Sequence, residues 1–172
     1  LAHRQIEQLA YYDVVTGLPN RHAFERRFSS ILKSAAKRQR KFALMFIDLD
    51  GFKRVNDALG HAAGDKLLNL VGEKLNDNLR GSDFAMQLSS PGSTMVARLG
   101  GDEFTIVLQN IDGPHGTQIV ANRFLNLLSK PFDIEGHEVF ISASIGIALY
   151  PDDGNNETDL LRFADAAMYE AK

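Results

Sequence analysis

The chain has 172 residues, a formal net charge of -3 and no cysteine. This length suits one domain with a sizeable core, and 44% hydrophobic with 24% charged residues is the balance of a soluble globular protein. The negative charge offers no basic field to a nucleic acid polymer or an anionic membrane. The longest apolar run, Phe42 to Ile47, is too short to span a bilayer. The absence of cysteine suits a reducing cytoplasm, where we expect the domain to lie; membrane anchoring of a parent protein stays open.

The two ends of the chain suggest a piece of a longer protein. Residues 1–12 place Ile6 and Leu9 on one helical face, which suits the end of a linker helix arriving from an upstream segment. Residues 13–172 are expected to form one domain, truncated just before its C-terminal end because the chain stops inside a predicted helix at Lys172. A frayed terminus is the alternative for the first segment.

The first half of the domain alternates helix and strand patterns. Asn20 is a good N-cap for a helix over residues 21–37, and the basic run at 37–41 indicates a solvated helix end. The apolar run Phe42 to Ile47 predicts a strand buried on both faces, ending at Asp48. A polar stretch then leads to a helix over residues 65–79, in whose first turn Asp65 is either a cap or a ligand.

The second half continues the alternation. Residues 84–94 predict an exposed loop or an extended hairpin arm, and residues 119–128 a helix that ends before Pro131. Residues 138–149 are β-rich with a glycine that reads as a bulge, and residues 158–172 predict a last helix. Helices alternating with strands, one pair of them joined as a glycine hairpin, predict an α/β or α+β sandwich.

The stretch from Met95 to Leu108 is the strongest candidate for a functional site. Two apolar runs flank Gly100-Gly101, a pair that can take positive φ in a hairpin turn. Asp102 and Glu103 follow, so a bulky anion could approach the bare turn while the carboxylates hold a metal. An ordinary hairpin with solvated acids is the other interpretation.

Asp48 and Asp102 form the candidate metal pair. Each marks a strand end, and if the two strands are neighbours, facing residues lie ~5 Å apart and can share one or two hard cations. Such a metal lowers the pKa of a hydroxyl and offsets charge on phosphate oxygens. Taken singly, each acid could equally be an ordinary strand-end residue.

A nucleotide site is compatible with the residues between the two acids. The sequence has no Walker loop and no Rossmann turn. Lys53 could reach a phosphate as a point charge, and Asn56 and Asp65 could read a purine edge such as guanine. His61 is a weaker base or phosphate contact. The alternatives are a solvated lysine, turn residues and a helix cap.

Several blocks in a fixed order resemble one known family. Residues 98–104, RLGGDEF, look like the signature that names the GGDEF family, the diguanylate cyclases. Further blocks covering nearly the whole chain are similar to those of the family: DVVTGLPNR at 13–21, IDLDGFKRVND at 47–57, GHAAGD at 60–65, SIGIA at 144–148 and ADAAMYEAK at 164–172. The resemblance implies a central, mainly antiparallel five-stranded sheet wrapped by helices, similar to adenylyl cyclase catalytic domains and polymerase palms.

The resemblance also implies an activity: joining two GTP molecules into cyclic di-GMP with loss of two pyrophosphates. It assigns Asp48 and Asp102 as ligands of two Mg²⁺ ions, with Mn²⁺ as an alternative, the Leu49 carbonyl as a further ligand and Glu103 as an additional candidate. Asp102 would accept the 3′-hydroxyl proton. The substrate contacts implied are Lys53 and Lys172 for phosphates, Asn56, Asp65 and His61 for guanine, and Gly100 and Gly101 for the α-phosphate.

The same resemblance implies partners. Because one domain holds one GTP, catalysis needs a homodimer in a C2 arrangement, set by the upstream helix. An upstream sensor domain, and a phosphodiesterase domain downstream as a further option, would belong to the parent chain. The rival hypothesis is a silent GTP- or cyclic di-GMP-binding module attached to a phosphodiesterase.

Two departures from the family pattern affect the predicted sites. The inhibitory Arg-x-x-Asp appears as Arg80 and Asp83, but about ten extra residues separate it from the signature arginine. If these residues form a hairpin extension, the pair can still bind product guanine; if they reroute the strand, feedback is lost. The arginine that follows the position of Lys172 in the family is missing, which weakens the expected phosphate contact.

Overall fold

A four-stranded antiparallel sheet forms the centre of the domain in the computed structural model, which describes residues 1–80, 94–111 and 113–172. Its strand order is β2-β3-β1-β6, and β4 and β5 pair separately as a small hairpin. The strands are β1 (Phe42–Asp50), β2 (Thr94–Gly100), β3 (Glu103–Gln109), β4 (Phe132–Ile134), β5 (His137–Val139) and β6 (Ser142–Tyr150). The predicted fold class is confirmed. The central sheet has four strands among the described residues, where five were expected.

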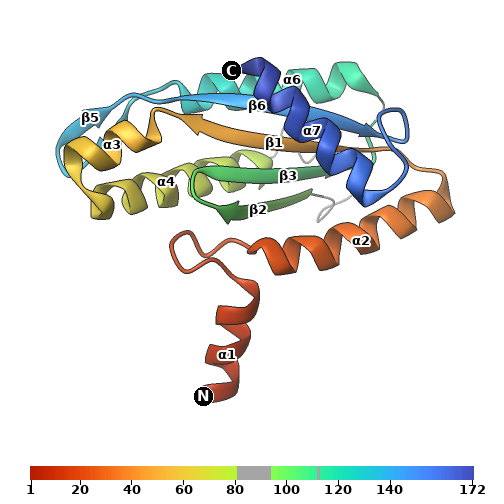
Figure 1. Cartoon of the computed structure of the whole chain (residues 1–172), viewed down its shortest axis with the longest axis horizontal. Coiled ribbons are helices and arrows are strands. Elements are labelled where there is room, and N and C mark those ends of the chain that lie inside the picture. The colour runs from red at the N-terminus through yellow and green to blue at the C-terminus, as the bar shows by residue number, and fades with distance from the viewer. Residues whose placement is uncertain (81–93, 112) are drawn as a thin grey trace.

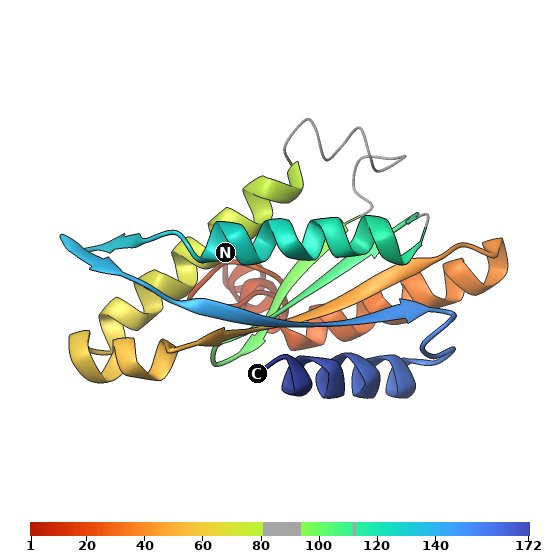
Figure 2. The ribbon, with the colours of Figure 1, turned by 90° about the horizontal axis from the view of Figure 1, so that it is seen from above.

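Six helices are present in the described part of the chain. They are α1 (Ala2–Tyr11), α2 (Arg21–Arg38), α3 (Phe52–Leu59), α4 (His61–Arg80), α6 (Pro114–Leu128) and α7 (Glu157–Ala171). Figure 2 shows α4 and α6 on one side of the sheet and α7 on the other, and the core clusters place α2 with α7. Helix α1 projects away from this body and buries no residue (Figure 1).

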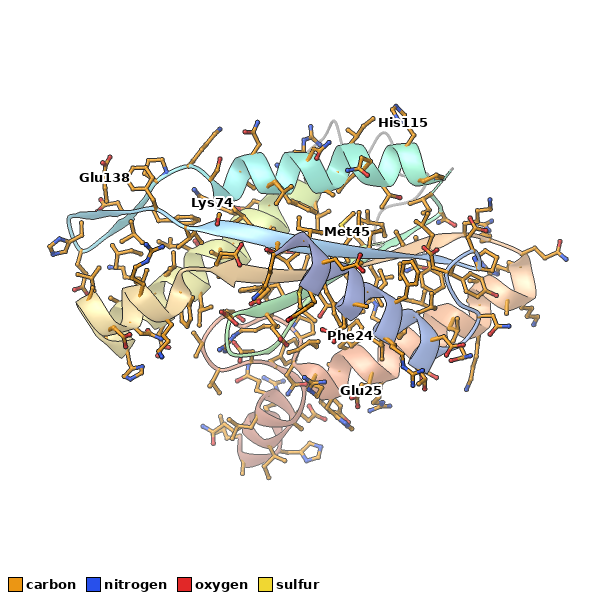
Figure 3. All side chains as sticks on the ribbon, turned by 45° about the horizontal axis from the view of Figure 1, so that its top comes forward. Phe24, Glu25, Met45, Lys74, His115 and Glu138 are labelled. Atoms are coloured by element: carbon orange, nitrogen blue, oxygen red, sulfur yellow. The ribbon has the colours of Figure 1, made fainter. Side chains whose placement is uncertain are left out.

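The central strand β1 separates two hydrophobic layers. Its alternate residues Ala43, Met45 and Ile47 pack toward α4 and α6, and Phe42 and Leu44 pack toward α2 and α7. Such alternation is the period of a β-strand, and burial of both faces explains the continuous apolar run. Figure 3 labels one side chain from each layer, Met45 on β1 and Phe24 on α2, and both are almost fully buried.

Local signals explain where the helices begin. The Asn20 side chain accepts a hydrogen bond from the Ala23 amide at 3.0 Å, so it caps α2 as predicted. Asn156 caps α7 in the same way through the Asp159 amide at 2.9 Å. Each cap satisfies an amide in the first turn of its helix and so fixes where that helix begins.

Three local predictions were wrong. The polar stretch after β1 is a helix, α3, which was missed because it has eight residues and only Val55 is buried. Helix α4 begins at His61, so Asp65 lies in its second turn and caps nothing. Gly146 pairs in regular register with Phe46 and is no bulge. A Cβ there would overlap the backbone of α7, so this glycine permits close helix–sheet packing.

Candidate active site

The two predicted metal-binding aspartates lie side by side at one end of the sheet. Antiparallel pairing of β1 with β3 sets Asp48 opposite Glu103, next to the hairpin turn that contains Asp102. The Leu49 amide donates to the Asp102 carbonyl at 3.1 Å and thereby ties the turn to β1. Strand β1 runs to Asp50, beyond the end predicted at Asp48, so Asp48 is held within a hydrogen-bonded strand.

The turn itself has the expected backbone. Gly100 and Gly101 have φ of 146° and 51°, in the region that glycine adopts without strain. A Cβ on either glycine would meet no other atom within 4 Å, so the outer surface of the turn is open. Asp102 lies within this turn, whereas the sequence pattern predicted that it directly follows the turn.

The two carboxylates lie close enough for the charge of one to affect the pKa of the other. Burial, then the hydrogen bond and the charge of Asp48, raise the pKa of Asp102 from 3.8 to about 6. Asp48 is only 7% exposed, and its Oδ1 has no hydrogen-bond partner among the described residues. Buried carboxylate oxygens in such a position are normally satisfied by a donor or a cation. The pair therefore suits a bound cation.

The last residue of the chain supplies a positive charge here. The Lys172 ammonium forms an ion pair with Asp48 Oδ2 and lies 4.0 Å from Asp50 Oδ1. The hydrogen bond to Asp48 raises the pKa of Lys172. Ser144 and Ser142 also donate to Asp50 Oδ2, at 2.8 and 3.5 Å. Among the described residues, no group of three or more His, Cys, Asp or Glu side chains could hold a metal, so the candidate centre offers Asp48 and Asp102 as its carboxylates.

Glu103 is the strand partner of Asp48 and follows Asp102 in the chain. Its side chain is exposed and borders a pocket of about 340 Å³ between α2 and α7, with an apolar floor that includes Phe46 and Leu99. Its predicted role as a further metal ligand stays a prediction.

Four of the predicted guanine and phosphate contacts, Lys53, Asn56, His61 and Asp65, lie on the helix pair α3–α4. Lys53 lies exposed in the first turn of α3, and Asn56 lies half-buried one turn later. His61 and Asp65 are exposed in the first two turns of α4. Asp65 borders a pocket of about 580 Å³ whose other wall includes Val14 and Val15. These loop residues were not predicted as part of a site, because apolar residues in a loop carry no chemical signal.

The loop that carries Val15 is fixed to α4 and to the hairpin. The Asn69 amide group donates to the Val15 carbonyl at 3.0 Å. Asp13 accepts from the amide and hydroxyl of Thr16 at 2.9 and 2.8 Å, which closes the turn before Leu18. The loop between α1 and α2 thus belongs structurally to the site region.

Comparison with known proteins decides the family. The sequence model described as "Diguanylate cyclase, GGDEF domain" matches residues 10–172. The chain belongs to the GGDEF family. The GGDEF domain of diguanylate cyclase TpbB from Pseudomonas aeruginosa is 39% identical, with a TM-score of 0.83 over 94% of this chain and 88% of that one.

Two other relatives of this GGDEF domain have names that include phosphodiesterase activity. It is 44% identical to the bifunctional diguanylate cyclase/cyclic di-GMP phosphodiesterase MucR, over 99% of this chain and 23% of MucR. It is 39% identical to the cyclic di-GMP phosphodiesterase NbdA, over 99% of this chain and 20% of NbdA. Both are from Pseudomonas aeruginosa. The chain therefore spans about a quarter or less of these two proteins.

Arg98, the first residue of the GGDEF domain's signature, has a role that sequence reasoning missed. Its Nη1 donates to Asp13 Oδ1 at 2.7 Å, and its Nε and Nη2 donate to the Gly101 carbonyl at 3.1 and 2.8 Å. Burial alone would raise the pKa of Asp13, but hydrogen bonds from Arg98 and Thr16 outweigh it and hold that pKa below its usual value. One guanidinium thus joins the turn to the loop after α1.

The predicted inhibitory pair cannot be placed. The backbone of Arg80 ends α4, but its side chain and the whole of Asp83 lie outside the described residues, as do residues 84–93 of the loop predicted over 84–94. Thr94, the last residue of that predicted loop, begins β2. Elsewhere in the GGDEF domain, no described helix is long and apolar enough to cross a membrane.

Proposed function

We propose that this domain is a diguanylate cyclase that condenses two GTP molecules into cyclic di-GMP and two pyrophosphates. The observation that carries the proposal is the meeting of Asp48 and Asp102 beside an open glycine turn, within an intact Gly-Gly-Asp-Glu-Phe signature. A degenerate family member would be expected to lack one of these groups. Relatives named as diguanylate cyclases support the same activity.

The Asp48 and Asp102 carboxylates, with the Leu49 carbonyl, would hold two Mg²⁺ or Mn²⁺ ions. The unpartnered Asp48 Oδ1 and the ammonium already beside Asp48 support a cation there. When bound, such ions supply activation of the 3′-hydroxyl and charge neutralisation on the phosphates. Glu103 is a further candidate ligand.

Residues of the domain would accept the proton, bind the phosphates and bind the base. Asp102 would accept the 3′-hydroxyl proton, a role that suits a carboxyl whose pKa lies nearer neutrality than usual. Lys53 and Lys172 would bind phosphate oxygens, and the bare turn at Gly100 and Gly101 would let the α-phosphate approach the backbone. Asn56 and Asp65, with His61 nearby, would bind guanine through hydrogen bonds that adenine cannot match.

Two domains would have to face each other, because each attack joins the nucleotide of one domain to that of the other. Helix α1 fits a role in pairing. Its Ile6 and Leu9 are 64% and 66% exposed and lie on one helical face. A sensor domain upstream, and a phosphodiesterase domain downstream, would belong to the parent protein. Cyclic di-GMP would inhibit through Arg80 and Asp83.

The alternative is a GTP- or product-binding module without turnover. The relationship to NbdA, which is named for phosphodiesterase activity, is the observation in its favour.

The test is incubation of the full-length parent with GTP and Mg²⁺, followed by chromatographic detection of cyclic di-GMP. Product that disappears in Asp102→Asn, whose fold is checked by circular dichroism, supports the proposal. GTP binding without any product would show the silent module instead.

A further inference from the structure

Helices α3 and α4 pack tightly against each other at Gly64, the fourth residue of α4. A Cβ built on this glycine would overlap Oδ1 of Asn56 and lie 2.8 Å from its Cγ and 3.3 Å from Cζ of Phe52. Phe52 and Asn56 are one turn apart on α3, so they present one face to α4. The contact has room for a hydrogen atom and for nothing larger.

The backbone does not require glycine at this position. Gly64 is not among the residues with positive φ and lies inside a regular helix, where alanine would be more favourable by about 1 kcal/mol. Its amide donates to the Gly60 carbonyl at 3.2 Å, as in any helix. A glycine that weakens its own helix needs a packing reason, and the side chain of Asn56 provides one.

The side-chain amide of Asn56 packs against α4 but does not have its full set of hydrogen bonds. Its Oδ1 is buried against Gly64 and has no hydrogen-bond partner among the described residues, although the residue as a whole is half-exposed. An unpaired buried amide oxygen costs about 1–3 kcal/mol, so the packing of α3 on α4 holds the Asn56 carboxamide in this orientation at a cost. Because the amide group is planar, seating one end against α4 turns the other end away from Gly64.

We propose that Gly64 is a positioning residue for the base site. By lacking a side chain, it seats the Asn56 carboxamide against α4 in the orientation that reads the edge of guanine, next to Asp65. This inference rests on the proposed function, since it takes guanine as the base that Asn56 contacts. A methyl group at residue 64 would displace the carboxamide and Phe52 together and leave the aspartate pair untouched.

The test measures binding of a GTP analogue that resists attack at its α-phosphate, by calorimetry in the presence of Mg²⁺. Gly64→Ala should weaken binding about tenfold, the loss of one hydrogen bond to the base. In an Asn56→Ala background the same substitution should weaken binding less than twofold, because the group through which it acts is gone.

Gly72→Ala is the matched control. It lies in the same helix and gains the same helix propensity, and its Cβ would meet only side-chain carbons, Leu18 Cδ1 at 3.2 Å and Thr16 Cβ at 3.6 Å. Binding in this variant should stay within twofold of the wild type.

A second variant covers the case in which Gly64→Ala does not fold. Asn56→Gln keeps the amide but places it one methylene further from the backbone, so the amide no longer fits against Gly64. This variant should therefore lose as much affinity for the GTP analogue as Asn56→Ala. Wild-type affinity in either Gly64→Ala or Asn56→Gln would overturn the inference. Failure of the wild type itself to bind the analogue would instead refute the proposed GTP site, and the positioning role with it.

Discussion

Replacing Asp102 by asparagine should stabilise the metal-free domain. The pKa of Asp102 rises from 3.8 to about 6, so the folded state holds its proton more tightly than the unfolded chain. The stability from this group is complete below pH ~3.8 and is lost as the pH rises through about 6. A rise of the pKa from 3.8 to about 6 corresponds to about 3 kcal/mol. Because the side chain is only half-buried, solvent screening reduces the expected effect to about 1 kcal/mol.

The assay is thermal unfolding in the presence of a chelator at pH 7.5 and at pH 4. At pH 7.5, Asp102→Asn should raise the melting temperature by about 2–4 °C, as expected for about 1 kcal/mol in a domain of this size. At pH 4 the wild-type carboxyl is largely protonated, so the gain should vanish. Glu103→Gln, a change in the neighbouring exposed acid, is the control and should show no comparable gain.

Mg²⁺ should reverse the order of stability. An ion that binds only the folded state raises its stability by mass action, so millimolar Mg²⁺ should raise the wild-type melting temperature more than that of Asp102→Asn. A variant that is less stable than the wild type at pH 7.5, or equally shifted at both pH values, would refute the reasoning that burial and the neighbouring Asp48 disfavour the charged form of Asp102.

Four further substitutions test separate contacts. Arg98→Lys loses the forked contact with Asp13 and the turn, so urea unfolding should show a loss of about 1–3 kcal/mol; an unchanged midpoint would contradict the role of the guanidinium. Gly146→Ala should destabilise by about 2–3 kcal/mol because its methyl overlaps the backbone of α7. Gly116→Ala, in an open position of α6, should instead stabilise by about 0.5–1 kcal/mol, and loss of stability there would be unexpected. Arg80→Ala should raise the cyclic di-GMP concentration that halves the reaction rate by about tenfold with little change in initial rate; identical inhibition would discard the feedback site.

Periodic burial explains why most elements could be predicted. Helices such as α2 and α7 each bury a continuous apolar stripe, and β1 is apolar on both faces, so each pattern is visible in the sequence. Helix α3 was missed because it has only eight residues and buries only Val55, so it shows no apolar stripe. A glycine in a strand fits a bulge or a close approach equally well, and only the neighbouring helix distinguishes the two at Gly146.

The sequence predicted those parts of the candidate site in which acidic residues lie next to apolar runs. Asp48 and Asp102 each follow or end an apolar run, and neighbouring strands bring them together. The link between Asp13 and Arg98 spans 85 residues and involves two common charged side chains, so no local pattern reveals it. The seat of Asn56 on Gly64 depends on how two helices cross, which the spacing of apolar residues does not determine.

The guanidinium of Arg98 gives the hairpin turn a mechanical connection to the segment that precedes the domain. Helix α1 leads directly into the loop of Asp13, and the amide of Arg98 also donates to the carbonyl of Pro19 at 3.0 Å. A movement of α1 relative to the sheet would therefore move the turn that carries Asp102 or break the contacts of Arg98 with Asp13 and Pro19. Arg98 thus ties the hairpin to the loop after α1 through two contacts, its guanidinium with Asp13 and its amide with Pro19.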